Sequence, residues 1–173
     1  MTLDVLLIAL RLVHVVGAVL WVGMMFFTTY FLLPAIQDAG PEGGKVMAAV
    51  QRRGVLTVMP LLAVSTILSG LWLYWRASLG FEPAYMHSRT GMTFGLGGAL
   101  AIVAYVLGLA VVRPSMMRAM KIMQTLDGAR SEDERRGRLR DVERLRARSG
   151  TAGRAVAWML LFAAASMAVA RYL

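Results

Sequence analysis

Four long apolar stretches dominate this chain of 173 residues, at about residues 5–34, 54–75, 91–112 and 155–170. A helix rises about 1.5 Å per residue, so roughly 20 apolar residues cross the hydrocarbon core of a bilayer. Charged residues make up only 17% of the chain, against about 25% in a typical soluble domain. The sequence therefore predicts an all-α integral membrane protein that forms a single four-helix bundle over residues 1–173.

Basic residues are concentrated in one segment, residues 113–154, which holds twelve of the nineteen Lys and Arg residues beside six acidic ones. The positive-inside rule places this segment in the cytoplasm, and four spans then leave both termini extracytoplasmic. Met116, Met120 and Met123 recur at helical spacing and predict an extension of the third span along the membrane surface. The rest of the segment predicts a short solvated helix with two supportive pairs, Glu132 with Arg136 and Glu134 with Arg138.

The composition excludes several function classes. The chain contains no cysteine, which excludes a disulfide scaffold, a thiolate metal site and a covalent c-type haem. No nucleophile triad, paired-carboxylate site or nucleotide-binding glycine loop is present. No aromatic or groove-reading motif accompanies the basic residues, so we expect the lipid bilayer, and not a nucleic acid, as the partner.

Ionisable residues inside an apolar span are costly and mark candidate functional positions. Arg11 and His14 are three residues apart in the first span and share a helix face with Trp21. The other histidine, His87, precedes the third span and falls on the same extracytoplasmic side as His14 in the predicted topology. Imidazole binds haem iron and copper well. The structural alternatives remain open: His14 as a buried histidine bonded to a neighbouring carbonyl or hydroxyl, and His87 as an interfacial loop residue.

Small residues mark the third span, where Gly91, Gly95 and Ala99 are spaced by four. Such a stripe lets another helix approach closely, and it would equally leave room for a flat macrocycle. In the second span, Pro60 predicts a kink and a freed carbonyl inside the membrane.

Three sequence segments resemble a known group. LRLVHVVGAVLWVG is similar to the first span of the HemJ-type protoporphyrinogen oxidases, and related patterns occur in the copper resistance D family. VQRRGVLTVMPLLAVSTILSGLWL resembles the second span, with an arginine pair and a membrane proline. YMHSRTGM resembles the entry to the third span. The resemblance covers about the first 112 residues; the fourth span lacks the family's Asn-Glu-Pro-like ending.

The resemblance implies a bundle that binds haem b in a bacterial-type inner (plasma) membrane and acts as a HemJ-like oxidoreductase or in electron transfer. It places His14 at the haem-associated histidine. His87 would be a second ligand or a gate, and Arg11 and Arg89 would pair with the propionates. Arg89 stands where the family has lysine, and an arginine cannot serve as a neutral amine ligand. The remaining residues expected to pack against the haem are Trp21, Gly17, Gly91 and Gly95.

Two alternative functions come from other classes. The first is an outer-leaflet copper-handling protein, whose ligands would be His14, Met25, His87, Met86 and Met92. The second is a non-catalytic accessory subunit of a larger membrane complex or a homo-oligomer, which would use the small residues of the third span for packing.

Overall fold

The computed structural model describes residues 2–128 and 131–173, and within these ranges the chain forms helices and short turns without a strand. The predicted all-α class is therefore confirmed. Four continuous helical stretches are long and apolar enough to cross a membrane, as expected of a multi-pass membrane protein. They are Asp4–Asp38, Val55–Ala77, Arg89–Gln124 and Glu132–Tyr172.

The elements follow one another with few interruptions. The first half contains α1 (Thr2–Phe27), the π-helical turn η1 (Thr28–Leu32), α2 (Leu33–Asp38), α3 (Gly40–Arg52), α4 (Val55–Ala77) and α5 (Pro83–Met86). The second half contains α6 (Arg89–Leu107), the π-helical turn η2 (Gly108–Val112), α7 (Arg113–Gln124), η3 (Leu126–Gly128), α8 (Glu132–Val169) and η4 (Ala170–Tyr172). Gly54 enters α4 with a φ of 78°, a left-handed conformation that glycine adopts without steric cost.

Two prolines explain the π-helical turns. Pro34 and Pro114 lack a backbone N–H, and their rings clash with the carbonyl four residues earlier. The helix widens before each of them: the N–H of Leu33 donates to the Thr28 carbonyl, five residues back, and the N–H of Arg113 donates to the Gly108 carbonyl. Single π-helical turns inside an α-helix are frequent at functional sites.

The fourth long helix begins much earlier than the sequence predicted. α8 is one helix of 38 residues from Glu132, so the short helix expected in the basic segment is not separate but continuous with the apolar stretch of residues 155–170. No proline interrupts this stretch. Its start is capped by Ser131, whose hydroxyl accepts from the Glu134 N–H at 3.2 Å, and the predicted Glu134–Arg138 pair forms at 2.7 Å. The predicted pair of Glu132 with Arg136 is wrong, because Glu132 pairs instead with Arg135, at 3.9 Å. Because the N-terminal cap and the ion pairs favour the helix and no proline interrupts it, α8 continues without a break to Val169.

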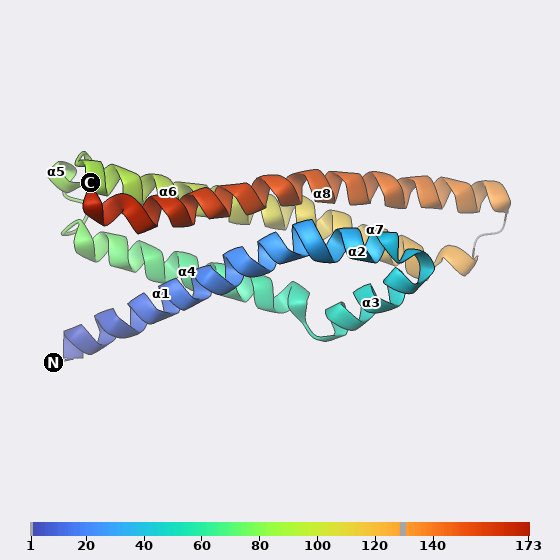
Figure 1. The fold of residues 1–173 in the computed structure, drawn as a ribbon, viewed down its shortest axis with the longest axis horizontal. Coiled ribbons are helices and arrows are strands. Elements are labelled where there is room, and N and C mark those ends of the chain that lie inside the picture. Colours follow the sequence, from blue (N-terminus) through green and yellow to red (C-terminus); the bar gives the residue numbers. More distant parts are fainter. Residues whose placement is uncertain (1, 129–130) are drawn as a thin grey trace.

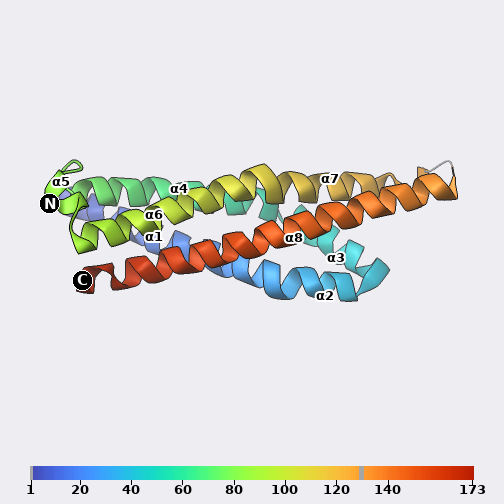
Figure 2. The same cartoon turned by 90° about the horizontal axis from the view of Figure 1, so that it is seen from above.

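The predicted extension of the third span beyond Pro114 is present, because α7 completes the continuous helical stretch Arg89–Gln124. α7 does not lie across the end of the bundle; it continues in line with α6 and packs along α8 (Figures 1 and 2). Its buried face contains the small residues Ser115 and Ala119, and the facing helix contributes buried Val142. Close packing against α8 therefore gives this segment a better apolar contact than a turn across the bundle end would.

The bundle has two distinct ends. The start of α1, the short helix α5 and the end of α8 lie at one end, whereas α3 and the facing ends of α7 and α8 lie at the other (Figure 1). Between them α1 crosses α4, and the core contains Trp21, Met25, Ala63, Ala104, Val156, Ala157 and Leu160. The turn that carries His87 therefore lies at the same end of the bundle as both termini (Figure 1).

Candidate functional site

His14 lies where α1 meets α4. Its Nδ1 atom is 2.8 Å from the carbonyl oxygen of Thr66, and the side chain is half-buried. Because a carbonyl only accepts, Nδ1 must carry the proton and donate it. In the neutral tautomer that makes this bond, Nε2 is the unprotonated nitrogen, and it has no hydrogen-bond partner among the described residues.

Two glycines allow the helices to approach at this level. A methyl group added at Gly70 would lie 2.5 Å from Cε1 of His14, and one added at Gly17 would lie 2.5 Å from Oγ1 of Thr66. Neither distance is tolerated by a real Cβ atom. Gly17 therefore serves helix packing, and Gly70 leaves the space that the imidazole occupies.

Thr66 is the polar centre of this crossing. Its carbonyl accepts from His14 and also, at 3.1 Å, from the Ser69 hydroxyl. Its own Oγ1 is buried and has no hydrogen-bond partner within the described part of the chain. A buried polar atom without a partner costs about 1–3 kcal/mol. Thr66 and Gly70 were not among the site residues predicted from the sequence. The signal for them is a Ser-Thr-x-x-Ser-Gly run, which places polar and small residues inside an apolar span.

Arg11 lies one helical turn before His14. The side chain is exposed, and it forms no ion pair with any described residue. An exposed guanidinium beside an apolar helix surface is available to an anionic group.

His87 and Arg89 lie elsewhere. His87 is exposed in the turn between α5 and α6, where its Nδ1 donates to the Pro83 carbonyl at 2.7 Å, and exposed Arg89 begins α6. His14 lies beside Gly70, seven residues before the end of α4 and hence about 10 Å from that end. The structure therefore places both histidines in the same half of the bundle but does not bring their rings together.

The remaining predicted haem contacts are occupied by protein. Gly91 lies against the backbone of Tyr85, and its carbonyl accepts from the Tyr74 hydroxyl at 3.0 Å. A methyl group at Gly95 would lie 3.3 Å from that same hydroxyl oxygen. Gly95 therefore lies against α4, as the helix-packing alternative expects, whereas the closest backbone neighbour of Gly91 is the preceding short helix α5. Trp21 is 5% exposed in the core and makes an edge-to-face contact with Tyr105.

The ligands expected of a copper protein are dispersed. Met86 and Met92 are exposed at the end of the bundle that carries His87, whereas Met25 is buried in the core. Among residues 2–128 and 131–173, no group of three or more His, Asp or Glu side chains could hold a metal ion.

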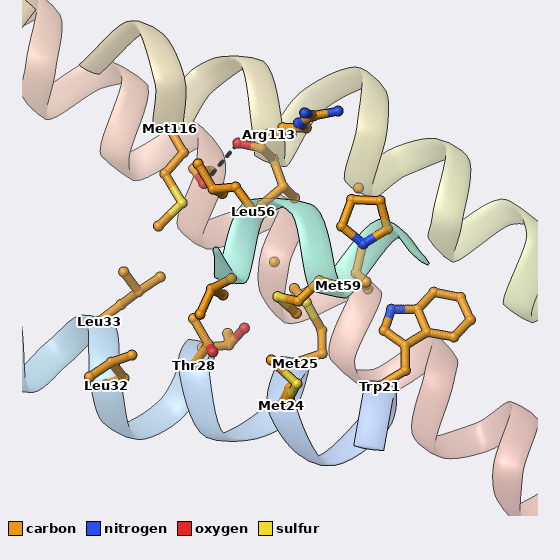
Figure 3. A pocket seen from close by; sticks show the side chains of 18 of the residues that line it. Trp21, Met24, Met25, Thr28, Leu32, Leu33, Leu56, Met59, Arg113 and Met116 are labelled. Carbon is orange, nitrogen blue, oxygen red and sulfur yellow. Dashed lines mark hydrogen bonds between the residues drawn. The ribbon is translucent and has the colours of Figure 1, made fainter. Parts of the chain in front are cut away.

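A cavity of about 290 Å³ lies in the half of the bundle that does not contain His14, towards the end that carries α3. Its walls come from every α-helix except α5 and from the two π-helical turns, and Figure 3 shows part of them. Five of its lining residues are methionines, which adapt to apolar ligands because they are flexible and polarizable. They are Met24, Met25, Met47, Met59 and Met116.

Comparison with protein-family models, curated proteins and solved structures finds no match for this chain. The chemistry available at the two sites therefore has to be inferred from their own geometry. One site is the His14 imidazole between α1 and α4, whose Nδ1 donates to the Thr66 carbonyl and whose Nε2 has no partner among the described residues. The other is an apolar cavity of the size that small ligands occupy.

Proposed function

We propose that the protein is a small membrane protein that binds haem b through His14 and acts in electron transfer. The observation that carries the proposal is the hydrogen bond from Nδ1 to the Thr66 carbonyl. Metal-ligating histidines nearly always donate their other ring N–H to such an oxygen, which fixes the tautomer and orients the free nitrogen. Bound haem b supplies one-electron redox chemistry at its iron.

The residues around His14 have separate roles in this proposal. Thr66 orients the imidazole through its carbonyl, and Gly70 leaves space for the ring. Arg11, exposed one turn away, offers a charge-assisted hydrogen bond to a propionate. His87 is not a second iron ligand in this arrangement, because the turn that carries it lies beyond the end of α4.

The haem proposal is tested on the purified full-length chain, expressed with haem supplied. We expect a Soret band, a reduced-minus-oxidised difference spectrum typical of b-type haem, and about one haem per chain. The measurement is an absorption spectrum combined with a pyridine haemochrome assay. A folded protein that contains no haem under these conditions would contradict the proposal.

The proposal also includes an orientation in a bacterial-type inner membrane. The end that carries α3 and the basic part of α8 faces the cytoplasm, and the end that carries both termini and α5 faces outward. The support is the concentration of Arg residues on the first half of α8, because cytoplasmic segments near spans are rich in Lys and Arg.

Sidedness can be measured directly, since the chain has no cysteine of its own. Single variants Glu82→Cys and Arg140→Cys place a thiol on exposed residues at opposite ends of the bundle. An impermeant maleimide added to intact cells is expected to label Glu82→Cys, and to label Arg140→Cys only after permeabilisation. The reverse pattern would show that the orientation is inverted.

A further inference from the structure

Four arginines recur at every fourth position on the first half of α8, and we call this set the arginine ridge. They are Arg136, Arg140, Arg144 and Arg148, and residues four apart are neighbours on the surface of a helix. All four are exposed, and none forms an ion pair with a described residue. Like charges four residues apart destabilise a helix, so this pattern does not serve the stability of α8.

The ridge points away from the rest of the bundle. The inner face of α8 is marked by Val142 and Ser149, both of which are buried. At about 100° per residue, Arg140 and Arg144 lie on the side of the helix opposite Val142. The ridge is therefore a free surface of the protein and not part of the packing between α7 and α8.

Acidic residues flank the ridge without interrupting it. Asp141 and Glu143 stand immediately before and after Val142, so they point to the two sides of α8, about 100° from its inner face. Both are exposed, and neither forms an ion pair with a described residue. The outward surface of this part of α8 is therefore a narrow basic row between two acidic flanks.

The ridge extends away from the membrane, because α8 runs along the long axis of the bundle (Figures 1 and 2). Ser149 donates to the carbonyl of Val112 at 3.5 Å, where the apolar part of the third long helix ends, so Arg148 lies at the membrane boundary. The head-group layer is about 5–8 Å thick on each side. At about 1.5 Å per residue, Arg140 lies about 12 Å and Arg136 about 18 Å beyond Arg148. Lipid head groups therefore reach the base of the ridge but not its outer half.

We propose that the arginine ridge docks an acidic helix of a partner protein, one that carries Asp or Glu at every fourth position. A planar guanidinium binds a carboxylate through two parallel hydrogen bonds. Rows of residues four apart on two helices align when the helices cross at about 50°, so each arginine then meets one carboxylate. Basic residues beside the acidic row of the partner would meet the two acidic flanks of the ridge.

A nucleic acid or a second copy of this chain suits the ridge less well. The phosphates of a duplex cover a surface broader than one row, so Asp141 and Glu143 would face phosphates and repel them. No aromatic side chain precedes Trp158 in α8 to stack on a base. A second copy that presented the same ridge across a two-fold axis would place arginine against arginine.

Two pairs of cations give a matched comparison. The ridge variant combines Arg136→Gln with Arg140→Gln and removes two charges from the ridge. The α7 variant combines Arg118→Gln with Lys121→Gln and removes two charges from exposed residues of the neighbouring helix. Glutamine favours a helix about as well as arginine and lysine do, so both variants should fold.

The test uses the purified full chain in nanodiscs of phosphatidylcholine and a fluorescein-labelled, alanine-rich peptide that carries glutamate at every fourth position. Fluorescence anisotropy measures its binding. We expect saturable binding that weakens as salt is raised. We also expect about fivefold weaker binding in the ridge variant and a change of less than about twofold in the α7 variant. Equal losses in the two variants would overturn the proposal, because they would show attraction by net charge alone.

A second peptide of the same composition tests the spacing. Its glutamates form one block and cannot line up on one face of a helix. We expect it to bind at least about threefold more weakly than the first peptide. Equal binding of the two peptides would overturn the inferred acidic row.

Lipid and nucleic acid are distinguished by two further measurements. In nanodiscs that also contain phosphatidylglycerol, the ratio of binding by wild type and ridge variant should stay the same; a ratio of one would mean that head groups occupy the ridge and would overturn the proposal. Tighter binding of a labelled DNA duplex than of the peptide, lost selectively in the ridge variant, would overturn it in favour of a nucleic acid. The peptide titration on His14→Ala is expected to give wild-type binding, so this inference and the haem proposal fail independently.

Discussion

His14→Ala is expected to abolish haem binding, whereas His87→Ala is expected to leave it intact. His14 is the one histidine whose Nε2 is free inside the bundle, with its Nδ1 fixed by the Thr66 carbonyl at 2.8 Å. Loss of an outer-shell partner of a metal ligand alone costs about 10–100-fold in affinity. Removal of the ligand itself should therefore lower the affinity for haem by more than about 100-fold. The measurement is the Soret absorbance per chain in both variants, each purified with haem supplied during expression.

The matched histidine variants separate a ligand from a structural residue. Loss of the bond from His14 to Thr66 should cost only about 1 kcal/mol of stability, so His14→Ala should remain folded by circular dichroism. Free imidazole should restore much of the Soret absorbance to the folded variant, because it can supply the missing ligand. A variant that retains the wild-type spectrum, or a folded one that imidazole does not restore, would show that His14 is a packing residue.

The sequence predicted the spans and the pairing of their ends because each depends on local composition. Apolar length alone located four helices, and four helices that alternate in direction place the turn that carries His87 at the same end as both termini. These properties require no knowledge of how the helices pack against each other.

The features that the sequence did not predict depend on contacts between segments distant in the chain. Whether Thr66 faces His14 depends on where α1 crosses α4, and neither span contains that information. The cavity is lined by residues of every α-helix except α5, so its lining methionines are recognisable as a group only in the folded bundle. The early start of α8 has another cause. The residues change from charged to apolar near residue 155, but this change does not mark the start of a helix, because nothing in the backbone ends α8 there.

Gly97→Leu is expected to disrupt the packing of α6 against α8 and to lower stability by about 3 kcal/mol or more. A Cβ at Gly97 would lie 2.6 Å from Oγ of Ser166 and 3.1 Å from the carbonyl oxygen of Ala163. Ser166 can rotate away, but the Ala163 carbonyl belongs to the backbone of α8 and can move only with the helix. The larger leucine side chain must therefore push the two helices apart.

The neighbouring glycine is the control for this effect. Gly98 is the next residue of α6, and a Cβ there meets nothing within 4 Å. Gly98→Leu should therefore be neutral or slightly stabilising, because leucine favours the helix by nearly 1 kcal/mol over glycine. Thermal unfolding of both variants in the same detergent measures the difference. Similar melting temperatures would mean that α6 and α8 are not in close contact at Gly97. A large difference would establish that the small residues of α6 are required for helix packing, which is independent of any haem.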